Sequence, residues 1–315
     1  MKIPVIIDCD PGTDDTIALT MALASDHLDV KAITTVAGNQ TAEKTAVNGL
    51  KIVSFLDKQV PVARGAENPI MRPLVTAGHV HGETGMAHVV LPEPKIDYLE
   101  TKAWDLFYEL SVIKNEKIHL ITLGPLSNVA IALMKYPKLK DGISQITMMG
   151  GAVGYGNDTP AAEYNIYADP EAAKMVFESG IPITMVGLDC THQAWLSAAE
   201  INAMGSPTEK NGIWLAQEMM HHIHAFATRF GFEGAIMHDP SAIAAVIDPT
   251  LIQTKDYFVT VETKGEHTTG KTVVDTLRVT GREPNAQVAL EINREGFVEL
   301  VKELMKRYES GGFRC

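Results

Sequence analysis

Four carboxylates lie within eight residues near the start of the chain, at positions 8, 10, 14 and 15. They follow the short apolar run 5–7, which is typical of a buried parallel strand. Pro11 and Gly12 would then end the strand and turn the chain. Like charges held this close repel one another strongly unless a cation or shared protons relieve the repulsion. Oxygen-rich clusters of this kind suit hard cations such as Ca²⁺ and Mg²⁺.

A simpler interpretation of these acids is local. Asp14 and Asp15 begin an apolar helical pattern and could stabilise its N-terminus, while Asp8 and Asp10 could be turn residues. Four acids directly after a buried strand are more than capping needs. They also stand where open α/β sheets bind ligands, at the carboxyl end of a strand. We therefore favour a metal site.

Other polar residues follow other predicted strands or lie in long loops. Asn39 follows a second strand at 30–36, and the turn after a strand at 118–123 can direct the backbone carbonyl of Leu123 outward. Further candidates lie in the loop after a strand at 146–149 and at the start of a late helix. These candidates are Asn157, Glu163, Asn165, His238 and Asp239.

The two late candidates also have simpler interpretations. Asp239 precedes Pro240 and an apolar helical run at 242–247, so it could be the N-cap of that helix, with the proline at its first position. Capping and metal ligation are compatible because a carboxylate has two oxygens. His238 could be an ordinary surface or core histidine.

The opening acids resemble those of the calcium-dependent nucleoside hydrolases, and for cleavage of a nucleoside these residues together provide what the reaction would require. Asparagines and carboxylates can bind ribose hydroxyls directionally. A carboxylate-held Ca²⁺ can lower the pKa of a bound water, and a neighbouring aspartate can take the proton of that water. Nearby anions stabilise an oxocarbenium-like transition state, and a histidine or aromatic rings can assist the departing base.

The elements that position these residues are predicted from apolar patterning. Strand-like runs alternate with helical patterns over the first two-thirds of the chain, which indicates an α/β fold with a mostly parallel, doubly wound (Rossmann-like) open sheet. Late strands without intervening helices are expected as antiparallel additions. We expect one domain, residues 1–315, in which 188–240 form a helical cover over the active site. The late strands are predicted at 257–262, 272–279 and 287–292, before a closing helix at 295–308.

Residues 265–272 match the phosphate-binding P-loop pattern letter by letter. That motif needs a strand before it and a helix N-terminus after it, so that backbone N–H groups cradle the phosphates. Here a β-branched run follows, at 272–279, which predicts a hairpin turn instead. We therefore expect no nucleotide-phosphate site at this position.

Composition narrows the class of protein. The 315 residues are 45% hydrophobic and 21% charged, an ordinary globular balance, and the net charge of −12 argues against binding nucleic acid polymers or anionic membranes. We expect neither a secretory leader nor a membrane span. Cys9, Cys190 and Cys315 are widely spaced and odd in number, which favours a reducing, cytoplasmic location.

The opening signature, Asp8-x-Asp10-x-x-x-Asp14-Asp15, resembles that of the calcium-dependent nucleoside hydrolases, the inosine-uridine preferring group. Further segments are similar to family segments in family order, so the resemblance covers essentially the whole chain. It implies an enzyme of nucleoside salvage, a nucleosidase that releases free base and ribose, assembled as a homotetramer or homodimer. These segments lie at 37–41, 81–86, 149–151, 162–165 and 238–240.

The resemblance also implies a role for each site residue. Asp10, Asp15, Asp239 and the Leu123 carbonyl would hold Ca²⁺, and Asp10 would also be the general base for the attacking water. His238 would be the acid for the leaving base, near which His81 would lie. The ribose would be held by Asp14, Asn39, Asn157, Glu163 and Asn165, with Met149 beside it.

The pocket for the leaving base departs from the family pattern. Phe226, Arg229, Phe230 and Phe232 occupy a region where family members often show a tyrosine, and phenylalanine can stack on a base but cannot donate a hydrogen bond. We expect Phe226 and Phe230 to contact the substrate, although packing of a helix at 211–228 would explain at least one of these rings. Three nearby histidines, at positions 221, 222 and 224, are interpreted as a solvated or interface face because neighbours on a helix do not converge on one ion.

Two other functions remain as alternatives. A metal-dependent phosphohydrolase could use Asp8 or Asp10 as nucleophile, but the opening motif has no basic neighbour to hold phosphate. A nucleoside-binding or sensing protein would keep the pocket without the chemistry. It would have no need of a base at Asp10 and an acid at His238.

Overall fold

An eight-stranded sheet runs through the computed structural model, which describes residues 2–205 and 210–309. All neighbouring strands of this sheet pair in parallel except the last two, β12 and β9, which are antiparallel. The strand order is β3 (Val62–Arg64), β2 (Leu28–Thr35), β1 (Ile3–Cys9), β4 (Ile118–Thr122), β5 (Ile143–Met149), β6 (Ile183–Val186), β12 (Ala286–Ile292) and β9 (Ile252–Tyr257).

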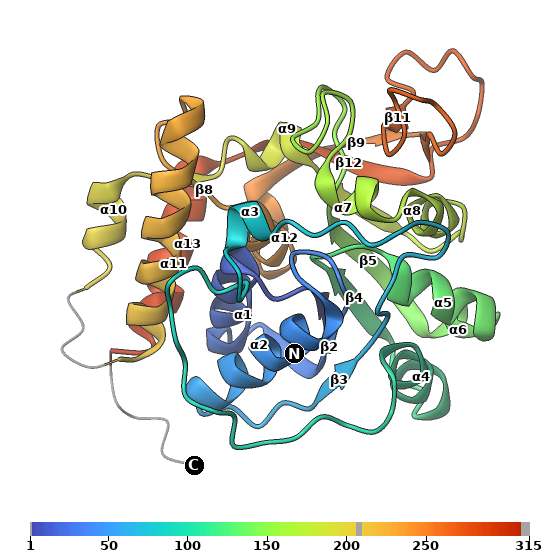
Figure 1. The fold of residues 1–315 in the computed structure, drawn as a ribbon. Coiled ribbons are helices and arrows are strands. Elements are labelled where there is room, and N and C mark those ends of the chain that lie inside the picture. The colour runs from blue at the N-terminus through green and yellow to red at the C-terminus, as the bar shows by residue number, and fades with distance from the viewer. Residues whose placement is uncertain (1, 206–209, 310–315) are drawn as a thin grey trace.

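Helices cover both faces of the sheet, as the alternating pattern predicted (Figure 1). Side chains of β1 alternate between two cores, with Ile7 in one cluster and Ile6 in the other. The first core is closed by α1 (Thr13–Ala24), α2 (Ala42–Phe55), α11 (Gly212–Ala227), α12 (His238–Ile247) and α13 (Arg294–Lys306). The second is closed by α4 (Ala103–Tyr108), a π-helical turn at Glu109–Ile113, α5 (Ser127–Lys135), α6 (Leu139–Gly142) and α8 (Pro170–Phe177).

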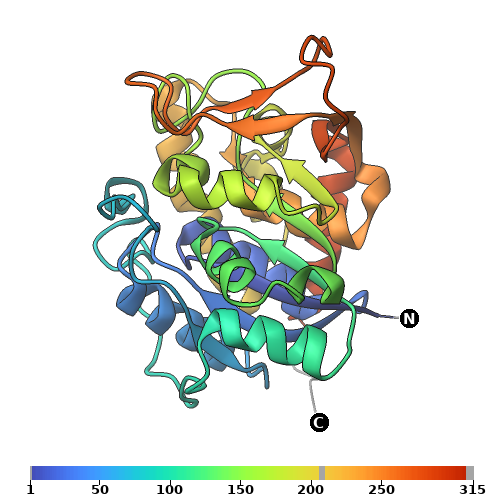
Figure 2. The ribbon, with the colours of Figure 1, turned by 90° about the vertical axis from the view of Figure 1, so that its right-hand side faces the viewer.

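The late strands follow a more mixed arrangement than patterning indicated. β12 pairs in parallel with β6 and antiparallel with β9, so it extends the parallel sheet as well as carrying an antiparallel edge. The residues that resemble a P-loop connect β10 (Val259–Val261) to β11 (Thr272–Val274), an antiparallel hairpin that lies at the periphery of the molecule (Figure 2). The predicted hairpin is thus confirmed.

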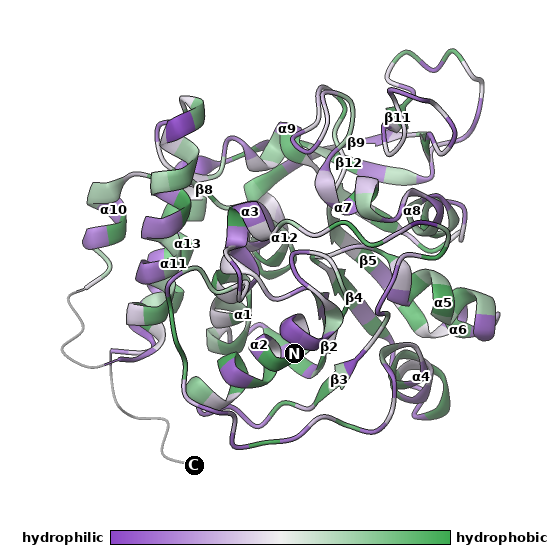
Figure 3. Ribbon diagram, viewed as in Figure 1, coloured by the Kyte–Doolittle hydropathy of each residue, from purple (hydrophilic) through white to green (hydrophobic). Residues whose placement is uncertain are grey.

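Residues 188–240 contain short helices around one long one. These are α9 (Leu188–Thr191), α10 (Ala198–Asn202) and α11, and the strands β7 (Trp195–Leu196) and β8 (Ala235–Ile236) pair antiparallel between them. A long, largely irregular segment after β3 carries the short helix α3 (Gly78–His81). No described helix is long and apolar enough to span a membrane, and hydrophilic and hydrophobic residues alternate along the helices (Figure 3).

Candidate active site

A cavity of about 540 Å³ opens at the carboxyl ends of β1, β2, β4 and β5, where parallel sheets present their ligand sites. It brings together nearly all the residues that the sequence singled out, from segments far apart in the chain. The predicted residues that line it are Asp14, Asn39, His81, Leu123, Met149, Asn157, Glu163, Asn165, Phe226, Phe230, His238 and Asp239. Asp10 and Asp15 are fully buried and do not line it.

The four N-terminal acids have different local roles. Asp8 lies inside β1 rather than in a turn, and its carboxylate accepts bonds from Thr34 Oγ1 at 2.5 Å and Asn128 Nδ2 at 2.8 Å. The Asp15 carboxylate accepts the backbone N–H groups of Asp10 at 3.1 Å and Gly12 at 2.9 Å. Asp15 therefore does cap α1, as the local interpretation expected, although its burial exceeds what a cap requires.

Two glycines leave room for the carboxylate of Asp10. Its Oδ2 accepts the backbone N–H of Asn39 at 2.6 Å, whereas its buried Oδ1 has no hydrogen-bond partner among the described residues. A Cβ at Gly38 would lie 2.1 Å from Oδ2, and one at Gly124 would lie 2.5 Å from Oδ1. Any side chain at either position would push Asp10 away.

Three carboxylates meet closely enough to share a cation. Oxygens of Asp14, Asp15 and Asp239 lie within 4.8 Å of one another. Asp10 adjoins this group, because its charge raises the pKa of Asp239, but it does not satisfy the same mutual distance. The sequence had named Asp10 rather than Asp14 as a ligand.

The electrostatics of this cluster fit a bound cation. Burial raises the pKa of Asp15 to about 7, and it raises the pKa of Asp10 and Asp239 well above the usual range, with repulsion from neighbouring aspartates adding to the effect. The buried Oδ1 of Asp14 also lacks a hydrogen-bond partner among the described residues, with Nδ1 of His81 4.0 Å away. A divalent ion would supply both the missing partner and the missing charge.

A backbone carbonyl and Asp239 complete the candidate ligand set. Leu123 O accepts Asn165 Nδ2 at 2.7 Å and keeps one lone pair free. The N-cap of α12 is Met237, so the expectation that Asp239 is the cap differs from the structure. Asp239 lies in the first turn, and its carboxylate makes no hydrogen bond within the described part of the chain. It is free for ligation.

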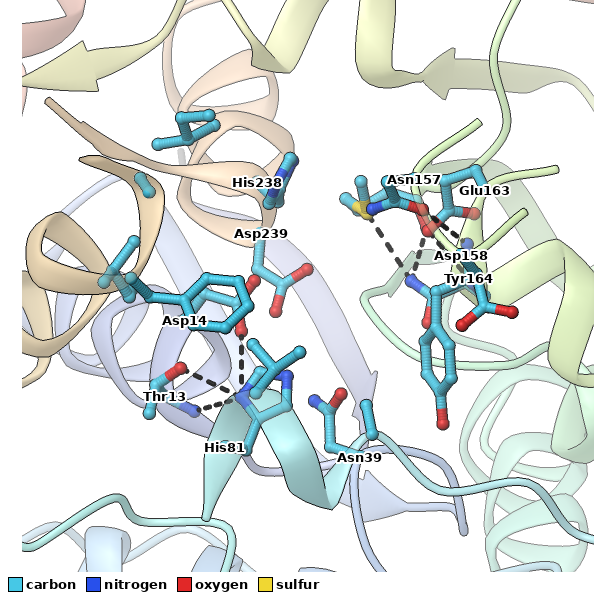
Figure 4. Close-up of a pocket in the computed structure, with 18 of the residues that line it drawn as sticks. Thr13, Asp14, Asn39, His81, Asn157, Asp158, Glu163, Tyr164, His238 and Asp239 are labelled. Carbon is cyan, nitrogen blue, oxygen red and sulfur yellow. Dashed lines mark hydrogen bonds and ion pairs between the residues drawn. The ribbon is translucent and has the colours of Figure 1, made fainter. Parts of the chain in front are cut away.

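The opposite wall is built around Glu163, at the N-cap of α7 (Tyr164–Ala168). Its carboxylate accepts the backbone N–H groups of Gly151, Asn165 and Ile166 at 2.9, 2.9 and 3.2 Å, and burial raises its pKa to about 7. Figure 4 shows Glu163 and Asn157 across the cavity from Asp14, with the carboxylate of Asp239 between the two walls.

Amide groups on both walls are already oriented by the protein. Asn165 Nδ2 bonds two backbone carbonyls, Leu123 O and Met149 O. Asn39 Nδ2 donates to Asp10 O at 3.1 Å and to Asp15 Oδ2 at 2.9 Å. With their amide hydrogens engaged, both side chains retain carbonyl oxygens that can accept bonds from hydroxyl groups.

His81 is buried on α3 and is held as a neutral ring. The backbone N–H of Thr13 donates to its Nδ1 at 3.2 Å, and Thr13 Oγ1 lies 2.9 Å from the same atom. Burial lowers the pKa of His81 to about 3. Since Nδ1 accepts a bond, the ring proton is on Nε2.

His238 stands above Asp239 (Figure 4). Its Nδ1 lies 2.8 Å from Thr191 Oγ1, and burial lowers its pKa to about 4 although the charge of Asp14 acts in the opposite direction. The ring of His192 packs edge-on against it, with centroids 5.7 Å apart. The imidazole is therefore neutral near pH 7.

Aromatic rings form the outer rim. Phe226 and Phe230 lie 5.1 Å apart between centroids, and Phe232 lies 5.3 Å from His192. Phe230 is 67% exposed and Phe232 is 37% exposed, so neither packs in the core. Arg229 is exposed and does not line the cavity.

Sequence reasoning missed several lining residues. His222 was assigned to a solvated or interface face, but it lines the cavity and its Nε2 lies 3.0 Å from Val80 O. This contact joins α11 to α3 across 142 residues, a pairing that helical spacing alone does not reveal. Thr13 and Tyr164, which adjoin residues already chosen, could have been found from that adjacency. Other missed residues with polar or aromatic side chains are His79, Tyr155, Asp158 and His192.

A doubly wound sheet that holds a carboxylate cluster and a wall of polar side chains at its strand ends is the arrangement expected of a nucleoside hydrolase. The chain belongs to the inosine-uridine preferring nucleoside hydrolase family, whose sequence model matches residues 5–299. It is an enzyme that hydrolyses the N-glycosidic bond of ribonucleosides to free base and ribose.

Individual relatives agree with this assignment. A pyrimidine-specific ribonucleoside hydrolase, RihA, from Salmonella schwarzengrund is 45% identical over 314 residues, covering 98% of this chain and 100% of the relative. The solved structure of a plant nucleoside hydrolase has a TM-score of 0.90 at 31% identity, covering 97% of this chain and 99% of its own. A purine-preferring ribonucleoside hydrolase from Gardnerella vaginalis has a TM-score of 0.89 at 33% identity, covering 96% and 98%.

Proposed function

We propose that this enzyme is a Ca²⁺-dependent hydrolase that prefers pyrimidine ribonucleosides. The observation that carries the metal dependence is the buried cluster of Asp14, Asp15 and Asp239, with the unpartnered Oδ1 of Asp10 beside it. Four anionic groups this close are tolerable together only with a cation or shared protons. Oxygen ligands of this number and charge favour Ca²⁺ among the common ions.

The base preference is supported by the relatives. RihA at 45% identity is named pyrimidine-specific, whereas the purine-preferring structural relative is 33% identical. Uracil and cytosine both carry a carbonyl oxygen, which can accept a hydrogen bond from a neutral histidine N–H. Two such histidines, His81 and His238, line the cavity.

We assign the ion to Asp10, Asp15, Asp239 and the Leu123 carbonyl. These groups would hold Ca²⁺, which would supply Lewis acidity to lower the pKa of a nearby water. Asp10 acts as general base and takes the proton of the attacking water on its unpartnered oxygen. The glycines at 38 and 124 keep this carboxylate in place.

The remaining residues bind and polarise the nucleoside. Ribose hydroxyls donate to the carboxylates of Asp14 and Glu163 and to the free carbonyl oxygens of Asn39 and Asn165, with Asn157 and Met149 beside them. As the glycosidic bond breaks, positive charge develops on the ribose, and these carboxylates stabilise it. His238, as a neutral ring, donates a hydrogen bond from its N–H to the departing base, and the rings of Phe226 and Phe230 stack against the base.

The phosphohydrolase alternative has no support in the cavity. No Lys or Arg lines it among the residues that the structure describes, so a phosphate would meet several carboxylates and no lysine or arginine to balance its charge. A cytoplasmic location, a homo-oligomeric state and a role in nucleoside salvage remain predictions.

The decisive experiment is a kcat/KM panel over uridine, cytidine, inosine, adenosine and 2′-deoxyuridine, before and after exhaustive chelation. We expect uridine and cytidine to exceed the purine nucleosides. We expect 2′-deoxyuridine to fall by about a hundredfold or more, because the ribose-binding groups lose a partner. Release of ribose from none of these nucleosides, or release unaffected by metal removal, would refute the proposal.

A further inference from the structure

Thr191 stands directly behind the active-site histidine. It lies at the end of α9, is fully buried, and places Oγ1 2.8 Å from Nδ1 of His238. This threonine does not line the cavity, so it has no direct access to a substrate. Whatever it contributes to the reaction must act through the imidazole.

The direction of this hydrogen bond follows from where buried hydroxyl groups find acceptors. In α1 and α12, Thr16, Thr20 and Ser241 donate to the carbonyl four residues back, at 2.5, 2.7 and 2.5 Å. Thr191 does not, and His238 Nδ1 is the partner that the described residues offer its hydroxyl. A buried hydroxyl left without an acceptor is costly, so its hydrogen points to Nδ1.

The same tautomer is enforced at the neighbouring histidine by different chemistry. At His81 the donor to Nδ1 is the backbone N–H of Thr13, which cannot accept a bond, and the ring must therefore carry its proton on Nε2. Each of these two histidines in the cavity thus has a threonine hydrogen-bonded to its Nδ1.

We infer that Thr191 is a positioning residue that fixes His238 in the Nε2–H tautomer, so that this ring presents a donor and not an acceptor to the departing base. The inference deepens the proposed function and rests on it. The base then leaves with a hydrogen bond from Nε2–H at a carbonyl oxygen, and the glycosidic electron pair stays with the base. In the other tautomer the ring would present a lone pair toward that oxygen and repel it.

The backbone around Thr191 is braced against movement. Met237 N donates to Ala194 O at 2.8 Å, and β7 pairs with β8, so the segments that carry Thr191 and His238 are joined. On its other side, Asp189 accepts the N–H groups of Val153 at 2.6 Å and Gly154 at 3.1 Å. The hydroxyl is therefore held at a fixed place behind the ring.

The test compares Thr191→Val, which keeps the shape and removes the hydroxyl, with Thr191→Ser, which keeps the hydroxyl. Each variant is assayed on uridine and on p-nitrophenyl β-D-riboside, whose phenolate departs without a donor. For Thr191→Val we expect kcat/KM on uridine to fall about tenfold or more, below the full 10²–10⁴-fold of a positioned acid. The riboside should change less than threefold, and Thr191→Ser should restore uridine cleavage.

Thr20→Val is the matched control, because it also removes a buried helical hydroxyl but lies outside the cavity. Its melting temperature gives the stability cost of losing such a group, and both substrates should be cleaved at the wild-type rate. Equal losses on uridine and the riboside in Thr191→Val would assign Thr191 a purely structural role and overturn the inference. No loss on either substrate would overturn it too.

The tautomer of His238 can also be observed directly in the wild-type enzyme. ¹⁵N-labelled histidine in the wild-type enzyme should show His238, assigned by loss of its signals in His238→Ala, with an unprotonated Nδ1 and a protonated Nε2. A protonated Nδ1 would contradict the inference even if the enzyme cleaves uridine. Failure of the wild-type enzyme on every nucleoside would instead refute the proposed function.

Discussion

The two ends of the cavity are built in different ways. At the floor, Asp10 and Asp15 are buried and held by backbone N–H groups at the ends of parallel strands. At the rim, Phe230 is 67% exposed, and the rings rest on one another and on histidines rather than on the core. A buried, hydrogen-bonded floor suits the step common to all nucleosides, whereas an exposed aromatic rim suits the choice of base.

The largest expected effect on activity comes from a substitution at the floor of the cavity. We expect Asp10→Asn to lower kcat/KM on uridine by about 10³-fold or more, because one substitution removes the general base and a metal ligand. p-Nitrophenyl β-D-riboside should lose as much, since attack by water precedes any choice of leaving group. Asp256→Asn, at an exposed position of β9, is the control and should leave both rates unchanged. A fall in kcat/KM on uridine but not on the riboside would show that Asp10 acts on the departing base and not on the attacking water, which would contradict its assignment to the floor.

A smaller effect should come from crowding the same carboxylate without removing it. Gly124→Ala places a Cβ 2.5 Å from Asp10 Oδ1, and a displacement of about 1 Å can cost about a hundredfold in rate. We expect kcat/KM to fall by that order while KM for uridine changes little. Gly49→Ala in α2, whose Cβ would have its nearest neighbour, Thr35 Cγ2, at 3.3 Å, should be as active as wild type. Unchanged activity in Gly124→Ala would show that Asp10 tolerates movement.

The rim should respond selectively. We expect Phe226→Ala to lower kcat/KM by about 2- to 12-fold, the range of one aromatic contact, and by different factors for uridine and inosine. For p-nitrophenyl β-D-riboside the fall in kcat/KM should differ again, because its phenyl ring differs from both bases. A uniform loss across all substrates would make the rim a structural element rather than a selector.

The smallest expected effect is on stability. Burial raises the pKa of Glu163 to about 7, so the folded protein holds a proton that the unfolded chain releases at its ordinary, lower pKa. In metal-free protein this contribution is full below the ordinary pKa and is lost as the pH rises through about 7. Melting temperatures from pH 4 to 8 should therefore decline, and Glu163→Gln should flatten the decline. An unchanged slope would contradict the assignment.

The same contrast explains what could be predicted from the sequence. Strands such as β6 were placed correctly because a buried parallel strand is a continuous apolar run. The floor residues follow those strands directly, so their meeting at one sheet edge was foreseeable. Asp14 and Asn39, which follow β1 and β2, accordingly line one cavity.

The rest depends on contacts that no local pattern encodes. The His222 side chain contacts the Val80 carbonyl, 142 residues away in the chain. Thr191 lies beside His238 next to the pairing of β7 with β8, and these strands are too short to be predicted from their apolar pattern. β12 pairs with β6 on one side and with β9 on the other. The apolar pattern of a single strand does not reveal which strands it pairs with. The capping role of Asp15 required its bonds to Asp10 and Gly12 to be seen.

The most direct measurement is a calorimetric titration of Ca²⁺ into exhaustively chelated enzyme, with ribose release followed in parallel. We expect one ion per chain, activity that returns in proportion to occupancy, and binding weakened at least about tenfold in Asp239→Asn. Full uridine cleavage by the chelated enzyme, or no Ca²⁺ binding in a folded and active protein, would contradict a cation among these carboxylates.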